Sequence, residues 1–273
     1  MEGFSSYKGT TAVVTGAAGS GMGGTTAARL IELGAEVYAL DLEEVTAPVK
    51  KYIRIDLGKK DAIERAAEQL PAKVDCLFNC AAAPGRPFSN LETSLVNFVG
   101  LRHLTEILIP RIKSGGAIAS ISSHGGTHWR QRLDPIRELL NISDWEESVA
   151  WLVAHEDIDS GYRFAKECVI VYTRWRAPEL GRREIRINCI APGPTTTPMY
   201  KRYWEKGLVT EGRLASLQGL CGRNATPDEM AGPLLFLNSS LASHITAETL
   251  YVDYGCTAAV EMGLREPHRF SKR

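Results

Sequence analysis

The stretch TAVVTGAAGSGMGG, residues 11–24, joins a β-rich apolar run to a cluster of glycines. Residues 25–33 then place apolar side chains among good helix formers, and Gly34 follows them. This order predicts a strand, a glycine turn and a helix. Glycines at such a turn let a pyrophosphate approach backbone N–H groups at the helix N-terminus, which makes the stretch a candidate dinucleotide site.

Strands and helices continue to alternate along the chain. Further strands are expected at 36–41, 52–56, 74–79, 117–123, 185–190 and 249–252, and helices at 61–70, 95–112, 161–177 and 227–237. Repeated strand–helix–strand units predict an α/β fold, a doubly wound parallel sheet with helices on both faces. A length of 273 residues suits a single domain spanning 1–273.

Residues 124–159 interrupt the alternation, because they form a connection much longer than most loops. Their apolar residues recur at helical spacing and predict a helical insertion of two short helices. Three tryptophans, Trp129, Trp145 and Trp151, either line a substrate cleft or pack the insertion's own core. The insertion is itself either functional or incidental.

Composition excludes several kinds of function. Lysine plus arginine equals aspartate plus glutamate at 32 each, so no global field would gather nucleic acid or an anionic membrane. The longest apolar runs are far shorter than the roughly 20 residues that a membrane helix needs. The first residues, MEGFSS, do not resemble a signal peptide, and the six cysteines form no C-x-x-C pair. A reduced, cytoplasmic protein is therefore expected.

Asp41 ends the second predicted strand, where a carboxylate can accept hydrogen bonds from both hydroxyls of an adenosine ribose. The same carboxylate would repel a 2′-phosphate. Residues 15–26 contain no Arg or Lys that could offset this repulsion. The sequence therefore predicts NAD as cofactor rather than NADP.

Tyr162 and Lys166 lie four residues apart on a predicted helix, so their side chains emerge on one face. A free tyrosine has a pKa near 10 and is a poor base at neutral pH, but a neighbouring ammonium favours the phenolate. Oxidation of an alcohol by hydride transfer needs such a base. This spacing also arises by chance on amphipathic helices, so its position in the chain has to support it.

Several motifs occur in an order that resembles the short-chain dehydrogenase/reductase family over nearly the whole chain. They are Thr15-Gly16 with Gly21-x-Gly23, Asn79-Cys80-Ala81, Ser122-Ser123, Tyr162-x-x-x-Lys166 and Pro192-Gly193. The glycine motif has one residue more than the family's pattern between Gly16 and Gly21. The resemblance implies a Rossmann-like fold and a nicotinamide cofactor.

The resemblance also implies which residues would contact that cofactor. Those expected are Gly16, Ser20, Gly21, Met22, Gly23, Asp41, Asp56, Leu57, Asn79, Ala81, Tyr162, Lys166, Pro192, Gly193, Thr195 and Thr197. Asp56 and Leu57 would flank the adenine, and residues 192–197 would meet the nicotinamide half. Asp56 could instead cap a strand end, and Asn79 could be a turn residue.

By the same resemblance, the catalytic set is Asn97, Ser123, Tyr162 and Lys166. Ser123 would hold the substrate oxygen, with Ser122 as the second candidate. The main-chain carbonyl of Asn97 would anchor a water that relays protons to Lys166, although an Asn on a helix surface is the competing interpretation.

Expected substrate contacts come from Ser123 and from residues that border it or follow Pro192-Gly193. These are Ser123, His124, Met199, Tyr203 and Trp204, the last three in an expected substrate loop at 195–222. Their character favours a hydrophobic or aromatic ligand, although helix packing would explain them equally well. His124 and His128 lack a third converging ligand, so no metal site is predicted.

A subgroup of the family, the 3α-hydroxysteroid dehydrogenases and more closely the coniferyl-alcohol dehydrogenases, is resembled by the insertion together with three motifs: Ala150-Trp151-Leu152, Asn188-Cys189-Ile190-Ala191-Pro192-Gly193-Pro194 and Thr197-Pro198. This implies NAD-dependent interconversion of an aromatic or alicyclic alcohol and its carbonyl, with Tyr162 as acid and base. A redox-neutral lyase or dehydratase and a non-catalytic NAD-sensing protein remain as alternatives. The expected assembly is a homodimer or homotetramer.

Overall fold

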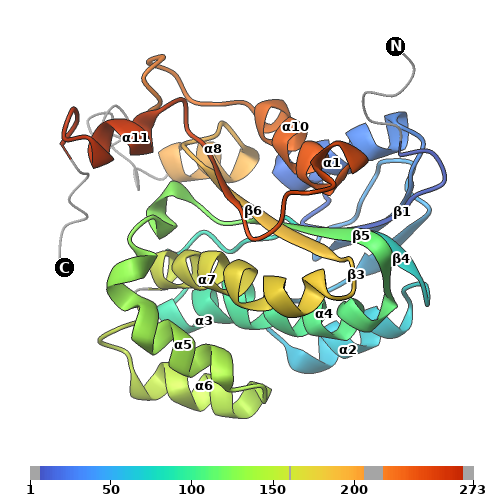
Figure 1. The fold of residues 1–273 in the computed structure, drawn as a ribbon, viewed down its shortest axis with the longest axis horizontal. Coiled ribbons are helices and arrows are strands. Elements are labelled where there is room, and N and C mark those ends of the chain that lie inside the picture. The colour runs from blue at the N-terminus through green and yellow to red at the C-terminus, as the bar shows by residue number, and fades with distance from the viewer. Residues whose placement is uncertain (1–6, 160, 206–217, 267–273) are drawn as a thin grey trace.

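A computed structural model describes residues 7–159, 161–205 and 218–266. Its centre is a seven-stranded parallel sheet in the order β3-β2-β1-β4-β5-β6-β7, with helices on both faces (Figure 1). The strands are β1 Thr11–Thr15, β2 Glu36–Asp41, β3 Lys51–Arg54, β4 Val74–Asn79, β5 Ile112–Ile121, β6 Arg186–Pro192 and β7 Thr249–Val252. The predicted doubly wound α/β fold is confirmed.

Apolar side chains alternate between the two faces of each strand and build one core on either side of the sheet. In β1, Val13 points into the core beneath α2, α4 and α7, whereas Ala12 and Val14 point into the core beneath α1 and α10. All three side chains are fully buried. This is why the strands read as nearly continuous apolar runs.

The helices cover the sheet in two layers (Figure 1). They are α1 Met22–Glu32, α2 Lys60–Glu68, α3 Asn90–Ser94, α4 Leu101–Leu108, α5 Leu133–Asn141, α6 Trp145–Ala154, α7 Tyr162–Gly181, α8 Pro198–Glu205, α10 Pro227–Asn238 and α11 Cys256–Glu261. A π-helix, Leu95–Gly100, joins α3 to α4. No helix within the described ranges is long and apolar enough to cross a membrane.

The helix predicted over 95–112 differs most from the structure. It begins earlier, at Asn90, because Ser89 and Glu92 form a capping box that satisfies the first N–H groups. It also ends earlier, since a 3₁₀ turn at Ile109–Arg111 leads directly into β5 at Ile112. The other predicted boundaries shift by a few residues, which is the usual uncertainty of helix and strand ends.

The insertion forms α5 and α6, the two helices that the sequence predicts, and they pack beside α7 (Figure 1). Ile136 and Leu139 of α5 are fully buried, and the Trp151 ring stacks on Phe164 of α7 with centroids 6.0 Å apart. All three tryptophans pack against the same hydrophobic core. The packing interpretation of these residues is therefore the one that the structure supports.

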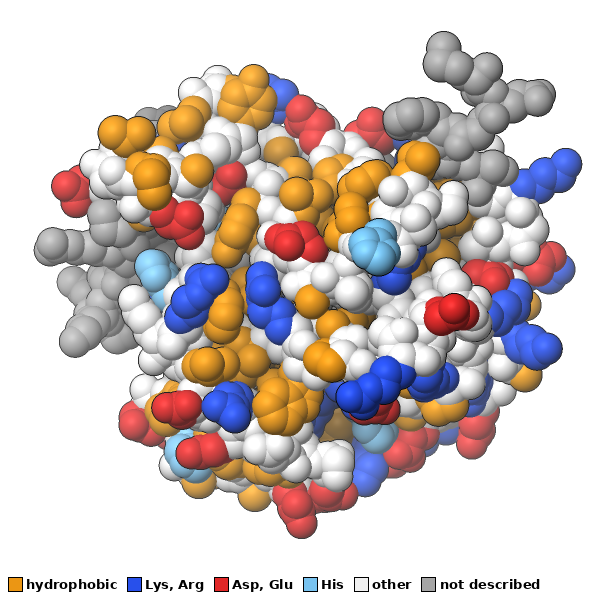
Figure 2. Space-filling model, in the orientation of Figure 1, with side chains coloured by type: hydrophobic (Ala, Val, Ile, Leu, Met, Phe, Trp, Pro, Cys, Tyr) orange, Lys and Arg blue, Asp and Glu red, His pale blue; other side chains and the backbone are white. Residues whose placement is uncertain are grey.

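The face shown in Figure 2 carries acidic and basic side chains intermixed, with no broad area of one sign. This agrees with the zero net charge of the chain. The predicted functional residues gather at the carboxyl ends of the parallel strands. There the strand order reverses between β1 and β4, the position at which ligands bind in open α/β sheets.

Candidate active site

The glycine turn between β1 and α1 packs backbone against backbone. Gly16 has a φ of 68°, and a Cβ added there would lie 2.7 Å from the Cα of Ala81. A Cβ on Gly23 would lie 2.2 Å from the carbonyl oxygen of Gly16. The N-cap of α1 is Gly21, which has no side chain to satisfy the first N–H groups of the helix. The turn therefore presents the backbone donors that a pyrophosphate requires, and the residues present fit a dinucleotide.

Asp41, at the end of β2, is held at the mouth of this turn. Its Oδ2 accepts a hydrogen bond from the backbone N–H of Ala18 at 2.9 Å, and its Oδ1 accepts one from Glu43 N–H at 3.0 Å. The two bonds fix the carboxylate while leaving lone pairs on both oxygens. The structure thus brings Asp41 and the glycine turn together, as the sequence predicts.

Thr15 connects the turn to the end of β4, a role that the sequence analysis did not assign to it. Its Oγ1 accepts hydrogen bonds from the backbone N–H groups of Cys80 and Ala81, at 3.0 and 3.1 Å. Only the pairing of β1 with β4 brings these residues together, so no local sequence signal could reveal the contact.

Asn79 and Asp56 use their side chains within the protein. Asn79 is buried and donates from Nδ2 to the hydroxyls of Thr105 and Ser120. Asp56 accepts from Gly58 N–H at 2.9 Å, which is the capping role weighed as its alternative. Leu57, next to it, is buried. Their cofactor contacts remain predictions.

Lys166 carries the charge of the predicted catalytic set and is almost completely buried. Only 1% of it is exposed, and its Nζ donates to the carbonyl oxygen of Ile121 at 2.8 Å. The ammonium lies 5.7 Å from the centroid of the Tyr162 ring, one helical turn earlier on α7. Burial lowers the pKa of Lys166 to about 8. Near neutral pH the lysine therefore still carries the charge that favours a phenolate beside it.

Ser123 faces Tyr162, and Ser122 does not. Burial raises the pKa of Tyr162, and the nearby side chain of Ser123 opposes the rise. Ser122 instead donates its hydroxyl to the main-chain carbonyl of Lys166 at 2.7 Å. Of the two serines, Ser123 therefore has the position that the predicted role requires.

Asn97 lies in the π-helix and is completely buried, which excludes the alternative of a surface asparagine. Its Oδ1 accepts from Ala83 N–H at 2.7 Å, and its Nδ2 donates to Ala83 C=O at 2.8 Å. Single π turns are frequent at functional sites, because the widened turn re-aims backbone carbonyls. The water-anchoring role of the Asn97 carbonyl remains a prediction.

The residues predicted for the nicotinamide side follow the end of β6. Gly193 N–H donates to Val252 C=O at 3.0 Å, and its Cα packs so closely that an added Cβ would lie 3.1 Å from Asp253. Thr195 and Thr197 are buried. The ring of His124 lies 3.2 Å from the carbonyl oxygen of Pro192, which places His124 beside the same segment.

Of the predicted substrate residues beyond His124, Met199 is half-buried in α8. Tyr203 and Trp204 belong to the same helix, but their side chains lie outside the described part of the structure, as do residues 206–217 of the expected substrate loop. Within the described ranges no three His, Cys, Asp or Glu side chains converge as a metal site would require.

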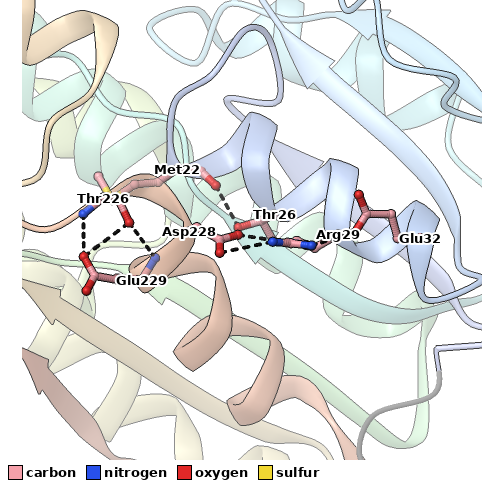
Figure 3. A network of polar contacts seen from close by, with 7 residues as sticks. All are labelled: Met22, Thr26, Arg29, Glu32, Thr226, Asp228 and Glu229. Atoms are coloured by element: carbon pink, nitrogen blue, oxygen red, sulfur yellow. Dashed lines mark hydrogen bonds and ion pairs between the residues drawn. The ribbon is translucent and has the colours of Figure 1, made fainter.

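The helix that follows the glycine turn is tied to α10 (Figure 3). Arg29 of α1 donates to both carboxylate oxygens of Asp228, at 2.8 and 3.1 Å. Thr226 and Glu229 form a capping box that fixes the start of α10 next to this ion pair. The glycine turn is thus supported from behind by a second helix.

A glycine turn that presents helix N–H groups at the reversal point of a doubly wound sheet defines a dinucleotide-binding protein. The comparisons with known families agree. The "short chain dehydrogenase" family model matches residues 10–133, and the "Enoyl-(Acyl carrier protein) reductase" model matches residues 140–257. The chain belongs to the short-chain dehydrogenase family, whose members are oxidoreductases that use a nicotinamide cofactor.

Characterised relatives cover almost the whole chain. It is 34% identical to the coniferyl-alcohol dehydrogenase of Pseudomonas sp. (strain HR199 / DSM 7063) over 248 residues, 89% of this chain and 94% of that protein. It is 28% identical to the 3-alpha-hydroxysteroid dehydrogenase/carbonyl reductase of Comamonas testosteroni, over 91% and 96% of the two chains. The fold matches that of the 3-alpha-hydroxysteroid dehydrogenase from Pseudomonas sp. B-0831 complexed with NADH, with a TM-score of 0.75 at 22% identity over 93% and 98%.

Proposed function

We propose that this protein is an NAD-dependent dehydrogenase that interconverts a hydrophobic aromatic or alicyclic alcohol and its carbonyl compound. The observation that carries the proposal is the convergence of three side chains. Ser123 lies close enough to Tyr162 to oppose the burial-induced rise of the tyrosine pKa, and the buried ammonium of Lys166 lies 5.7 Å from the centroid of the Tyr162 ring. This arrangement suits proton transfer at an alcohol oxygen.

In the proposed reaction, Ser123 donates a hydrogen bond to the substrate oxygen and Tyr162 accepts the hydroxyl proton. Lys166 lowers the cost of forming the phenolate, because its charge lies beside the tyrosine in a site of low polarity. The glycine turn and Asp41 would hold the cofactor, and the residues after β6 would orient its nicotinamide. A bound nicotinamide supplies the carbon that takes up the hydride.

The choice of NAD over NADP rests on Asp41. Two backbone N–H groups fix its carboxylate at the mouth of the glycine turn. A ribose with two free hydroxyls can donate hydrogen bonds to this carboxylate. A 2′-phosphate would be repelled by it, because the two backbone hydrogen bonds hold the carboxylate in place. Asp41→Asn should therefore narrow the preference for NAD over NADP, measured as a ratio of kcat/KM values.

The substrate class rests on the relatives and on Met199, an apolar residue that is half-buried in α8. The names of the relatives from Pseudomonas sp. (strain HR199 / DSM 7063) and Comamonas testosteroni give their substrates as coniferyl alcohol and 3-alpha-hydroxysteroids. Both are alcohols with extended apolar bodies. A hydrophobic pocket that places a secondary or allylic alcohol at Tyr162 would serve either kind.

The test is to follow NADH formation by absorbance while the protein meets NAD with aromatic, allylic and steroid alcohols. Tyr162→Phe, which keeps the ring and loses the hydroxyl, is the matched control. We expect turnover in the wild type that falls by about 10²- to 10⁴-fold in the variant, the range for a general base. Faster turnover with NADP would contradict the Asp41 argument. Binding of NADH without turnover of any alcohol would contradict the dehydrogenase and favour the lyase or the sensor.

We further propose a homodimer in the cytoplasm. Trp175, Phe236 and Leu241 are large apolar side chains with more than a third of their surface exposed, and pairing would bury them. All six cysteines are free, and five of them are buried, which suits a reducing compartment. Light scattering of the purified protein tests the dimer, and a monomeric mass would overturn it.

A further inference from the structure

The segment that connects the insertion to Tyr162 is held by one buried carboxylate. Asp159 is 3% exposed, and its Oδ1 accepts two hydrogen bonds. One comes from the backbone N–H of Gly161 at 2.8 Å, and the other from the hydroxyl of Ser94 at 2.7 Å. The main-chain carbonyl of Asp159 accepts a third bond, from Nδ2 of Asn90 at 2.9 Å. Asp159 thus joins the start of α7 to α3.

The backbone conformation and the packing at Gly161 restrict which residue can stand there. Gly161 has a φ of 64°, which only glycine adopts readily, and an added Cβ would lie 2.8 Å from Oδ1 of Asn90. Tyr162 is the next residue and the first of α7. The position of the tyrosine therefore depends on the hydrogen bonds that anchor Gly161.

The anchoring partner continues directly into the element that carries Asn97. Ser94 ends α3, and the π-helix that contains Asn97 begins at the next residue. The Asp159 carboxylate therefore links the tyrosine end of α7 to the segment with the predicted water-anchoring carbonyl. The two hydrogen-bond donors to Oδ1 of Asp159 lie within three residues of Tyr162 or of Asn97: Gly161 N–H precedes Tyr162, and Ser94 Oγ is three residues before Asn97.

We propose that Asp159 is a positioning residue for the reaction: its carboxylate sets the position of Tyr162 relative to Ser123 and Asn97. This inference rests on the proposed function. It also gives the insertion a role, because residues 124–159 end at the aspartate that fixes the catalytic tyrosine. Burial raises the pKa of Asp159, and the hydrogen bonds from Ser94 and Gly161 and the charge of Arg132, from the same insertion, oppose this rise.

A second aspartate in the insertion provides a matched control. Asp144 caps α6, where its Oδ1 accepts from Glu147 N–H at 2.9 Å, and within the described ranges no hydrogen bond joins it to α3 or α7. Asp144→Ala removes a carboxylate acceptor from the same insertion at a distance from Tyr162. Asp159→Asn is the conservative variant, because the amide oxygen can still accept from Gly161 N–H and Ser94 Oγ.

The experiment compares the wild type with Asp159→Ala, Asp159→Asn and Asp144→Ala. It measures kcat and KM with the best alcohol, the dissociation constant for NADH, and hydrogen exchange of the amides at 161–166. We expect Asp159→Ala to lower kcat by about 10- to 100-fold, because small misplacements of a reacting group cost rates of this size. The dissociation constant for NADH should stay within about twofold, and exchange at 161–166 should accelerate by about tenfold. Asp159→Asn should restore both properties, and Asp144→Ala should change neither.

The outcomes separate this inference from the proposed function. If the wild type oxidises no alcohol but Asp159→Ala alone loosens residues 161–166, the dehydrogenase proposal fails and the anchoring is supported. If the wild type is active and Asp159→Ala keeps its kcat, the positioning inference is wrong. It is also wrong if Asp144→Ala lowers kcat as much as Asp159→Ala does, because the effect would then be general loosening of the insertion.

Discussion

The two halves of the site are built by different means. At the cofactor edge, the glycine turn works because side chains are missing, and its contacts are between backbone atoms of Gly16, Gly23 and Ala81. Along α7, Lys166 and Glu167 are almost completely buried charged side chains, and their pKa values are shifted by that burial. The glycine turn depends on shape, and the buried face of α7 depends on charge.

This difference predicts how each half responds to change. A backbone contact has no rotamer that could relieve a clash, so the glycine turn should be intolerant of added atoms. Buried charges cost stability in exchange for chemistry, so α7 should gain stability when a charge is removed and should lose activity when that charge is Lys166.

The largest effect is expected for Gly23→Ala. The new Cβ would lie 2.2 Å from the carbonyl oxygen of Gly16, so the turn has to shift. We expect the free energy of unfolding to fall by about 3 kcal/mol, as for severe overpacking, together with loss of NADH binding. Urea denaturation and NADH titration measure both. Gly232→Ala in α10 is the control, since nothing lies within 4 Å of its Cβ and it should stabilise the helix by about 0.5–1 kcal/mol.

Lys166→Met should divide activity from stability. We expect kcat to fall by about 100-fold, because the phenolate loses its cation. The folded-state pKa of about 8 lies below that of an exposed lysine, so folding disfavours the ammonium. The variant should therefore be more stable than the wild type at pH 7. Loss of the hydrogen bond to Ile121 offsets part of the gain, so we expect the free energy of unfolding to rise by about 1–2 kcal/mol.

The pH dependence checks the sign of this argument. Between pH 8 and about 10.5, the unfolded wild type binds more protons than the folded protein, so wild-type stability from this group rises with pH. The difference in the free energy of unfolding between Lys166→Met and the wild type should therefore shrink as pH rises from 8 to about 10.5. Lys50→Met, at an exposed lysine paired with Glu36, should show no such gain. A variant that is less stable than the wild type at pH 7 would refute the claim that charge burial costs stability here.

Glu167→Gln should change the free energy of unfolding less than Lys166→Met does. Its stability difference from the wild type should grow, and not shrink, as pH rises. Both carboxylate oxygens of Glu167 are buried without a hydrogen bond among the described residues, and the nearest cation, Arg132, lies 3.4 Å away. Burial raises the pKa of Glu167 to about 7. Stability from a raised carboxyl pKa is present at low pH and is lost as pH rises through 7.

We therefore expect Glu167→Gln to exceed the wild type by about 1 kcal/mol at pH 8 and to match it at pH 5. Thermal unfolding at the two pH values measures this difference. Glu32→Gln, at an exposed ion pair, should show no change with pH. An equal difference at pH 5 and pH 8 would mean that Glu167 does not titrate in this range.

The smallest effect is expected for Asp228→Asn, which breaks the ion pair between α10 and α1 (Figure 3). Both partners are about half exposed, so we expect a loss of about 0.5 kcal/mol or less. The loss should shrink in 0.5 M salt, because the Debye length falls to about 4 Å at that concentration. A loss above that of Gly23→Ala would show that the cofactor edge depends on its outer support and not on the shape of the turn.

Much of the cofactor half could be predicted from the sequence, because its signals are local. The run from Thr11 to Gly24 contains the strand, the turn and the helix start together, and Asp41 follows at the end of the next strand. The catalytic spacing of Tyr162 and Lys166 is local as well. What could not be predicted is the set of partners, such as the acceptance of two N–H groups by Thr15 or the core contacts of Asn79.

The sequence by itself determined the order of strands and helices, the glycine turn, and the residues that define the family, because periodicity, glycine and short spacings act within one segment. Only the tertiary structure decided that Ser123 and not Ser122 faces Tyr162, that Asn97 is buried in a π-helix, and that Asp159 anchors the start of α7. These relations join residues far apart in the chain. Burial and hydrogen bonding of this kind depend on how the sheet and helices pack, which no single segment encodes.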